Sequence, residues 1–464
     1  MYKLKGNGTA VITGFDWGVN GSNDVYVPRM IDGYTVSEIG DSAFSSEKGN
    51  GYSVVVVLPD TITVIGEKAF WGSAITAISI PQSVQLIGSG AFAGCTNLES
   101  HNVEAGNPIY TTINGILFDK TKKELVSFPA GRTAILENLP SSSTAIPDGI
   151  VSIGEYAFAG CTIEIDGYIC PDSLKRIENY AFCKAWFKGH DEFLNLNNVE
   201  FIGDYAFTEA TFGYLVEVCG GAKEIGAFAF ANTVLYRQYG GFTSGNVEKI
   251  GPYAFAGVGF FSGKDTIKLP STLKELGEGA FAQVYKDDRG RLKNLDFSET
   301  NITTIPKYAF SESDVTVLLP EKVLTIDPYA FHDYHGGMVG IPNSVTSIGA
   351  YAFAESRGAF IQDANKSNLK NIDEYAFYNV SYLSEADDDN LILPKKLESI
   401  GSHAYWTNNT VIMDIPATVK TIGDDFCDRS KTTLKVVPGS FAAIYASENG
   451  YRVQGDEDTS WLND

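Results

Sequence analysis

A six-residue phrase recurs along this chain: an aliphatic residue, usually a glycine, two variable residues, and Ala-Phe. It occurs fourteen times, first at 39–44 and last, with tyrosine in place of phenylalanine, at 400–405, and a shortened copy follows at 422–426. Such internal repetition is typical of solenoids, in which each unit is too small to bury its own apolar face and stacks on its neighbours. The sequence therefore predicts a stack of about 15 coils.

A proline eleven residues before the aromatic residue marks a rigid half of the repeat. The proline and aromatic pairs are Pro59 and Phe70, Pro81 and Phe92, Pro147 and Phe158, Pro171 and Phe182, Pro270 and Phe281, Pro320 and Phe331, Pro342 and Phe353, and Pro394 and Tyr405. The distance from the aromatic residue to the next proline varies, from ten residues after Phe310 to fifty-five after Phe92. We expect the rigid half to form the core and the variable half to form loops, where insertions are tolerated.

The residues around each proline predict the local structure. Apolar Ile78 and Ile80 alternate with Ser79, which is the period of a short strand, and the proline that follows ends the strand. The next apolar positions, Val84 and Ile87, have a spacing closer to that of a helix. We therefore expect one or two helical or 3₁₀ turns after each strand.

The glycine of the phrase needs its own explanation. Pro306 occupies the same slot in one copy, and a proline ring fixes φ near about −65°. A requirement for positive φ is therefore disfavoured, and we attribute the glycine to the close approach of neighbouring backbones.

Charge and hydropathy exclude several classes of partner. The formal net charge of −22 disfavours nucleic acid and anionic membranes. No apolar run approaches the length that spans a bilayer. The first residues, 1–6, lack the apolar core of a signal peptide, so we expect either a cytosolic protein or a mature form whose leader or lipid anchor has been removed.

The six cysteines do not form a disulfide framework. Cys95 and Cys161 each lie three residues after a repeat phenylalanine, and Cys170 takes the aliphatic position before a proline. Repeated placement in a core slot predicts buried, free thiols.

These landmarks resemble one known family, the BspA-like, or Treponema pallidum-type, leucine-rich repeats. The resemblance covers about residues 25–440 and is clearest in the segment 80–95, IPQSVQLIGSGAFAGC. Residues of about 100–140 resemble a hairpin-bearing variant repeat of that family, and 437–445 resemble its C-terminal cap. At Glu178, Asp327 and Asp373 the chain departs from the pattern, because these residues replace the glycine.

The resemblance implies a right-handed, curved leucine-rich-repeat solenoid with short parallel strands on its concave side and caps at both ends. We expect an N-terminal cap and first strand at 1–38, the solenoid at 39–436 and a C-terminal cap at 437–464. It also implies a non-enzymatic bacterial protein, secreted or on the cell surface, that binds a host matrix or bacterial surface protein. The alternatives are a glycan-binding surface module and a structural spacer without a ligand of its own.

Neither a catalytic motif nor a cofactor motif contradicts this expectation. The chain contains no Gly-x-Ser-x-Gly elbow and no His-Glu-x-x-His pair. We therefore expect no enzymatic activity, no cofactor and no bound metal.

The candidate binding residues are the outward positions of the strands before the prolines. For so acidic a protein these positions are unexpectedly neutral and partly aliphatic, which favours a protein or peptide partner. The alternative is that adjacent strands simply cover one another. The candidates are Val55, Val57, Ala77, Ser79, Lys268, Leu318, Ile392, Ile412 and Asp414.

Three further features are weaker candidates. A column of aromatic residues lies two positions before the repeat phenylalanine, and we interpret it as a packing ladder in preference to a glycan site. The acidic run 385–389 and the pair His332 and His335 could bind a cation, but a solvated turn and an incomplete ligand set are favoured. The aromatic column comprises Tyr156, Tyr180, Tyr205, Phe228, Tyr253, Tyr308, Tyr329, Tyr351 and Tyr375.

Overall fold

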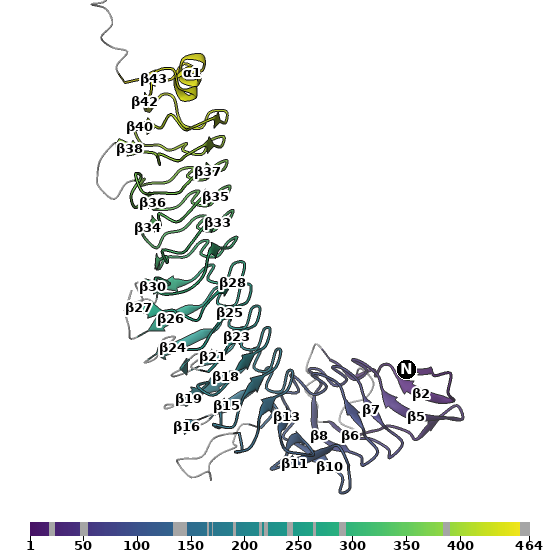
Figure 1. The fold of residues 1–464 in the computed structure, drawn as a ribbon. Coiled ribbons are helices and arrows are strands. Elements are labelled where there is room, and N and C mark those ends of the chain that lie inside the picture. The colour runs from purple at the N-terminus through teal and green to yellow at the C-terminus, as the bar shows by residue number, and fades with distance from the viewer. Residues whose placement is uncertain are drawn as a thin grey trace, which may run out of the picture. The chain divides into compact units, whose positions relative to one another are not determined.

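The structure, a computed structural model, describes residues 1–17, 24–46, 54–132, 146–164, 167–168, 170–188, 192–212, 216–217, 221–238, 245–262, 266–286, 294–383 and 390–454. The chain divides into two compact units, Met1–Gly240 and Gly241–Asp464. Each is a β-solenoid, and the described residues make about 16 turns (Figure 1). The stacked fold predicted from the repeat is confirmed.

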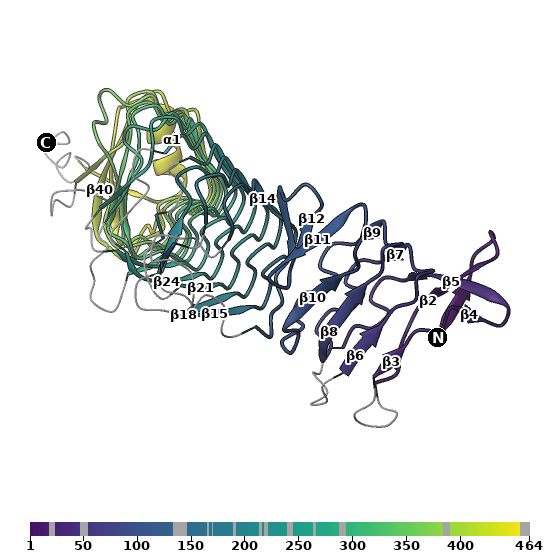
Figure 2. The same ribbon diagram turned by 90° about the horizontal axis from the view of Figure 1, so that it is seen from below.

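Two kinds of strand recur in the first unit, and both begin in its first turns. Strands that precede a proline form a parallel sheet in the order β10-β8-β6-β3 (Figure 2). A second sheet runs in the order β1-β2-β5-β7-β9, with β4 beside β5, and in it β7 and β9 are short strands that end at the first residue of a repeat phrase. The strands are β3 (Val25–Tyr26), β6 (Val54–Val57), β8 (Ile75–Ile80) and β10 (Ser100–Val103), and β1 (Tyr2–Leu4), β2 (Thr9–Ile12), β4 (Met30–Ile31), β5 (Tyr34–Ile39), β7 (Val64–Ile65) and β9 (Leu86–Ile87).

The remaining turns of the first unit form three sheets. A hairpin opens the first of them, in the order β11-β12-β13-β14-β17-β20-β23, and the others run β15-β18-β21-β24 and β16-β19-β22. The strands are β11 (Tyr110–Ile113), β12 (Ile116–Asp119), β13 (Glu124–Ser127), β14 (Ser152–Ile153), β15 (Thr162–Glu164), β16 (Gly167–Tyr168), β17 (Arg176–Ile177), β18 (Trp186–Lys188), β19 (Glu192–Asn195), β20 (Phe201–Ile202), β21 (Thr211–Phe212), β22 (Val216–Glu217), β23 (Glu224–Ile225) and β24 (Val234–Gln238).

The second unit repeats the same scheme. Short strands at the repeat phrase pair in the order β31-β33-β35-β37-β39-β41, and β25 pairs with β28. The other strands pair as β26-β29, β27-β30-β32, β34-β36 and β38-β40-β42-β43. The strands are β25 (Lys249–Ile250), β26 (Gly259–Ser262), β27 (Thr266–Lys268), β28 (Glu275–Leu276), β29 (Tyr285–Lys286), β30 (Asn294–Asp296), β31 (Thr304–Ile305), β32 (Thr316–Leu318), β33 (Thr325–Ile326), β34 (Met338–Ile341), β35 (Ser347–Ile348), β36 (Gly358–Ile361), β37 (Asn371–Ile372), β38 (Asn390–Ile392), β39 (Ser399–Ile400), β40 (Val411–Ile415), β41 (Thr421–Ile422), β42 (Thr432–Val436) and β43 (Arg452–Val453).

The segment after each proline is not helical, so in this detail the sequence-based prediction was wrong. Among the described residues the only helix is α1 (Phe441–Glu448), which begins at the N-cap Ser440. In a typical coil the short strand is followed by overlapping turns, closed by bonds from Ala69 N to Gly66 O (3.3 Å) and from Trp71 N to Lys68 O (2.9 Å).

Left-handed backbone at two fixed positions explains this. Lys68 and Gly72, two residues before and two residues after Phe70, have φ of 52° and 66°. The same pair of positions is left-handed in the coil of Phe158, at Tyr156 (58°) and Gly160 (70°). Because a right-handed helical run requires negative φ throughout, these residues replace it by consecutive turns.

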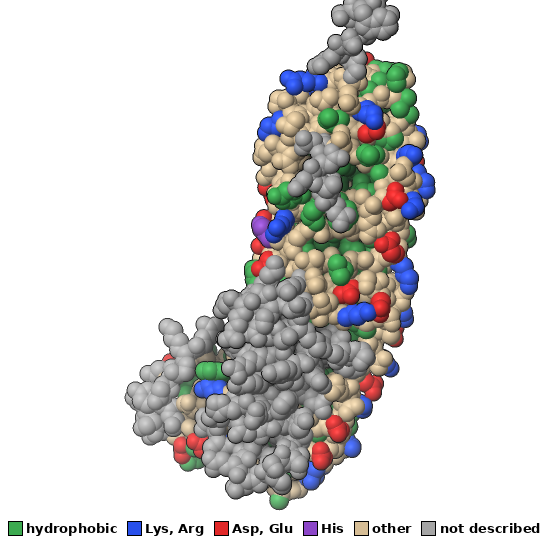
Figure 3. Space-filling view, turned by 90° about the vertical axis from the view of Figure 1, so that its left-hand side faces the viewer, with side chains coloured by type: hydrophobic (Ala, Val, Ile, Leu, Met, Phe, Trp, Pro, Cys, Tyr) green, Lys and Arg blue, Asp and Glu red, His purple; other side chains and the backbone are tan. Residues whose placement is uncertain are grey.

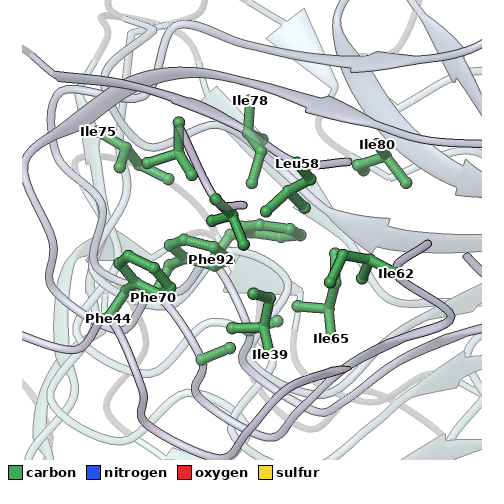
Figure 4. Packing of buried hydrophobic residues seen from close by; sticks show 14 of the residues in the cluster. Ile39, Phe44, Leu58, Ile62, Ile65, Phe70, Ile75, Ile78, Ile80 and Phe92 are labelled. Atoms are coloured by element: carbon green, nitrogen blue, oxygen red, sulfur yellow. The ribbon is translucent and has the colours of Figure 1, made fainter. Parts of the chain in front are cut away.

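The repeat phenylalanines stack into the core that the sequence predicts. The Phe44, Phe70 and Phe92 rings follow one another with centroids 5.0 and 5.6 Å apart, among aliphatic residues of both kinds of strand (Figure 4). Between turns, Phe44 N donates to Ala69 O (2.7 Å). Each coil therefore adds one aromatic ring and a set of backbone hydrogen bonds to its neighbour.

The expectation for the repeat glycine is confirmed. A Cβ on Gly66 would lie 2.7 Å from Asp41 N and 2.8 Å from Gly40 C, while its backbone is not left-handed. Neighbouring backbones therefore leave no room for a side chain at this slot. The thiols of Cys95 and Cys161 are free and buried, as predicted, and so is the thiol of Cys170.

The interruption after Phe92 contains the expected hairpin. Strands β11 and β12 are joined by Asn114 and Gly115, both left-handed (φ 50° and 77°), which is the geometry that a two-residue hairpin turn favours. Phe128 then takes the place of a repeat phenylalanine, with its ring 4.8 Å from that of Phe158. The boundaries expected for the caps and the solenoid remain predictions.

Candidate functional site

The strands before the prolines show the predicted alternation. Val54 and Val56 of β6 are buried, whereas Val55 is half-buried and Val57 is exposed. The same alternation places the other candidates outward: Ala77, Ser79, Ile412 and Asp414 are half-buried, and Lys268, Leu318 and Ile392 are exposed.

The four candidates of the first unit lie together on one sheet. Its register aligns Tyr26, Val57, Ser79 and Asn102 in one row and Val55, Ala77 and Ser100 in the next. We call these seven residues the uncharged strand patch. Tyr26 and Val57 are its most exposed apolar members, at 70% and 37%. None of the seven carries a formal charge, although the chain as a whole is strongly acidic.

The candidates of the second unit fall on two sheets. Lys268 and Leu318 lie on β27 and β32, on either side of Asp296, while Ile392 lies opposite Asp414 on β38 and β40. Figure 3 views this unit from the side of these strands and shows hydrophobic side chains among charged ones.

The second unit's strands carry charge, and both charged candidates are paired. Lys268 Nζ lies 2.6 Å from Glu299 Oε1, and this hydrogen bond raises the pKa of the lysine. Asp414 Oδ2 lies 3.3 Å from Lys435 Nζ. The candidates of the first unit are therefore neutral by residue type, whereas in the second unit Lys268 and Asp414 are neutralised by ion pairs.

The aromatic column forms the expected packing ladder. In the first unit the Tyr156, Tyr180 and Tyr205 rings stack with centroids 4.6 and 4.8 Å apart and planes within 7°. In the second unit Tyr329, Tyr351 and Tyr375 stack in the same way, at 5.0 and 4.6 Å. Because each ring covers the face of the next, the inner rings have no free face on which a sugar could stack.

The histidine candidate does not assemble a ligand set in the described chain. The side chains of His335 and Asp333 lie 3.5 Å apart, and no group of three or more His, Cys, Asp or Glu side chains in the described ranges could hold a metal. The acidic run 385–389 lies outside these ranges.

Comparison with protein families identifies the family of the repeat. The family described as "BspA type Leucine rich repeat region (6 copies)" matches residues 30–141, 136–260, 242–359 and 303–433. The chain belongs to the BspA type leucine-rich repeat family. The resemblance seen in the sequence is thereby confirmed.

Solved leucine-rich repeat proteins of three bacteria are similar to this BspA type chain. A leucine-rich repeat protein of Bacteroides ovatus is 18% identical, with a TM-score of 0.45, over 98% of this chain and 97% of that chain. A leucine rich cell surface protein of Faecalibacterium prausnitzii is 21% identical, with a TM-score of 0.41, over 83% of this chain and 93% of that one. A leucine-rich repeat protein of Eubacterium ventriosum is 16% identical, with a TM-score of 0.31, over 83% and 94%. None of the curated proteins matches the chain.

The BspA type repeats also contain a feature that sequence reasoning missed. A cleft of about 290 Å³ opens in the first unit where the repeat is interrupted, lined by residues 87–93, 124, 126–127, 154–156 and 178. Two signals could have revealed it: the fifty-five residues that separate Phe92 from the next landmark proline, and Gly90, which leaves the aromatic column without a side chain. As for membranes, α1, the helix found in the described ranges, is too short to cross one.

Proposed function

We propose that this chain is a non-enzymatic bacterial protein, secreted or on the cell surface, that binds another protein through the outward faces of its strands. Family membership supports the localisation, because the resemblance to BspA-like proteins implies export by bacteria, and many of those proteins are cell-surface adhesins while others remain uncharacterised. The partner we expect is a host matrix protein or a bacterial surface protein.

The uncharged strand patch is the observation that carries this proposal. It presents an exposed tyrosine and valine beside Ser79 and Asn102, on strands held in register by backbone hydrogen bonds. Cores of protein interfaces are depleted in charge and enriched in tyrosine. Because the patch lies on stacked strands, little conformational entropy is lost when a partner docks.

Leu318 and Ile392 supply the corresponding positions of the second unit. Their side chains are 43% and 56% exposed, and on the same sheets Lys268 and Asp414 are paired with Glu299 and Lys435. A partner that covers these two ion pairs would not need to strip water from an unpaired charge at Lys268 or Asp414.

The test uses the whole chain on immobilised host matrix proteins, mucin and intact bacterial cells, with binding measured by surface plasmon resonance or by cell counting. We expect Tyr26→Asp and Val57→Asp to weaken binding at least tenfold, because each places a carboxylate in a desolvated interface. Leu318→Asp and Ile392→Asp test the second unit in the same way.

Leu324→Asp is the matched control. Leu324 is 48% exposed, which is comparable with Leu318, but it lies outside the strands that carry the candidates. If the control weakens binding as much as Val57→Asp, or if no protein binds the chain while mucin glycans do, the proposal is wrong.

A further inference from the structure

At the cleft, the hydrogen bonds that join the backbone of one coil to that of the next are broken off. In the preceding coil, Lys68 N donates to Ser89 O (3.0 Å) and Phe70 N donates to Ala91 O (2.8 Å). One coil later, the corresponding donors are Gly90 N and Phe92 N. Neither has a hydrogen-bond partner among the described residues.

The neighbouring coil explains why these donors remain unpaired. Gly94 N still reaches Ala159 O, at 3.3 Å, but the acceptor that would serve Phe92, Ala157 O, is taken by Phe128 N (2.8 Å). The acceptor that would serve Gly90 is the Glu155 carbonyl, which also has no partner in the described ranges. The two coils therefore part between these residues, and the unpaired groups line the cleft.

Unpaired backbone groups in such a place favour a ligand. Gly90 and Phe92 are buried residues, and a buried N–H without a partner costs about as much as a lost hydrogen bond. In the preceding coil the same two positions, Lys68 N and Phe70 N, meet two carbonyls that are separated by one residue, Ser89 O and Ala91 O. A ligand backbone that offers two carbonyls in this arrangement would take the place of the missing coil, much as a peptide adds to the open edge of a sheet.

The lining of the cleft is acidic. Glu124, Glu155 and Glu178 line it, and two cations lie nearby: Arg176 is 2.7 Å from Glu178 Oε1, and Lys68 Nζ is 5.1 Å from the centre of the Tyr156 ring. Desolvation, followed by the nearby carboxylates, raises the pKa of Glu124. A cationic group would relieve this repulsion.

Apolar surface completes the site. Ile87 is partly exposed, whereas its counterpart one coil earlier, Ile65, is fully buried. Val126 is half-buried on the cleft wall, and both Ile87 and Val126 pack against the core. A β-branched or other aliphatic side chain of a ligand would bury them further.

We propose that this cleft binds an extended peptide segment that alternates aliphatic and basic side chains. Its carbonyls accept from Gly90 N–H and Phe92 N–H, one of its amides donates to the Glu155 carbonyl, and its Lys or Arg side chain lies among the three glutamates. This site is separate from the strand faces proposed above and does not depend on them.

The probe is the peptide acetyl-Val-Lys-Val-Lys-Val-amide, compared with its twin in which both lysines are glutamates. Hydrogen exchange read by mass spectrometry should show faster exchange in residues 86–94 than in residues 64–72 of the free protein, and slowing in 86–94 alone when the lysine peptide is added. Fluorescence anisotropy of the labelled peptide should show at least about threefold weaker binding by Glu124→Gln and a larger loss by Glu124→Lys.

Glu321→Gln is the matched control, because Glu321 is an exposed carboxylate that does not line the cleft. It should bind the lysine peptide as the wild type does. Equal binding of the glutamate twin, unchanged exchange in 86–94, or full binding by Glu124→Lys would overturn the proposal.

Two other occupants are separated by the same experiment. If spermidine displaces the labelled peptide as strongly as the unlabelled peptide does, the cleft recognises positive charge alone. This result would overturn the role of the backbone groups. Protection of 86–94 on self-association of the free protein, abolished by Glu124→Lys, would assign the cleft to a second copy of the chain and overturn the peptide proposal.

Discussion

The ring of Tyr180 lies face to face with the ring of Tyr205, with centroids 4.8 Å apart and planes 2° apart, although both residues have left-handed backbone, at φ 58° and 56°. A tyrosine rarely adopts this conformation, because its Cβ crowds the backbone. The aromatic column therefore offsets a backbone cost, repeated in each coil, by stacking along the flank of the solenoid.

Substitutions at Tyr205 separate these two effects. Tyr205→Ala keeps the left-handed strain but loses stacking on Tyr180 and Phe228, so we expect it to lower the free energy of unfolding by about 1–3 kcal/mol. Tyr205→Gly should cost less than Tyr205→Ala, because glycine adopts positive φ freely. Urea denaturation followed by far-ultraviolet circular dichroism measures both.

Tyr205→Phe is the control for the stacking argument. The Tyr205 hydroxyl has no hydrogen-bond partner among the described residues, so this change should stay within about 0.5 kcal/mol of the wild type. If alanine proves no worse than glycine, the left-handed strain is not significant.

A second prediction concerns the buried column. Phe207 is fully buried and stacks between Phe182 and Phe230, at 5.0 and 4.9 Å. Phe207→Ala should destabilise the fold by about 3–5 kcal/mol, because neighbouring coils fixed by backbone hydrogen bonds cannot close over the cavity. Thermal melting measures the loss, Leu324→Ala is the exposed control, and an unchanged melting temperature would contradict the packing described here.

The buried half of the molecule was predictable because it repeats. The spacing of Pro81 and Phe92 places one aromatic ring per coil, and the alternation in Val54–Val57 gives the faces of the strand. The exception Pro306 was enough to infer close backbone approach at the glycine slot. Each of these inferences depends on burial, which constrains residue type directly.

Backbone geometry and the cleft were not predictable in the same way. Lys68, Tyr156 and Glu209 have left-handed φ, as several glycines do, so the residue type does not predict which positions are left-handed. The cleft depends on hydrogen bonds that Gly90 and Phe92 fail to make, which no side-chain pattern records. Both follow from how one coil meets the next.

The glycine slot gives a third prediction. Gly66→Ala would bring a Cβ to within 2.7 Å of Asp41 N, and because backbone atoms cannot move aside we expect a loss of at least about 2 kcal/mol. Gly6→Ala is the matched control, since nothing lies within 4 Å of its Cβ position. Equal stability of the two variants in urea would mean that close approach does not explain the repeat glycine.

Acid sensitivity gives the fourth prediction, centred on His101. This side chain is 2% exposed, packs edge-on against Phe92 at 5.0 Å, and has Nδ1 3.2 Å from Gly115 O. Desolvation lowers its pKa from the usual 6.5 to about 4. Between these values the unfolded chain binds more protons than the folded one, so the free energy of unfolding falls as the pH falls from 6.5 to about 4, by roughly 3 kcal/mol in all.

His101→Phe should remove this part of the pH dependence. The phenylalanine keeps the contact with Phe92. The backbone N–H of residue 101, which donates to Gly115 O at 2.8 Å in the wild type, is unaffected by the change of side chain. Urea denaturation at several pH values between 4 and 7 gives the slope of the free energy of unfolding against pH for the variant and for the wild type. Carboxylates that titrate in this range contribute equally to both slopes, so their contribution cancels in the difference. Leu324→Ala, which removes no titratable group, should retain the wild-type slope. Parallel pH profiles for His101→Phe and the wild type would mean that the buried imidazole takes up its proton without unfolding the hairpin that covers it.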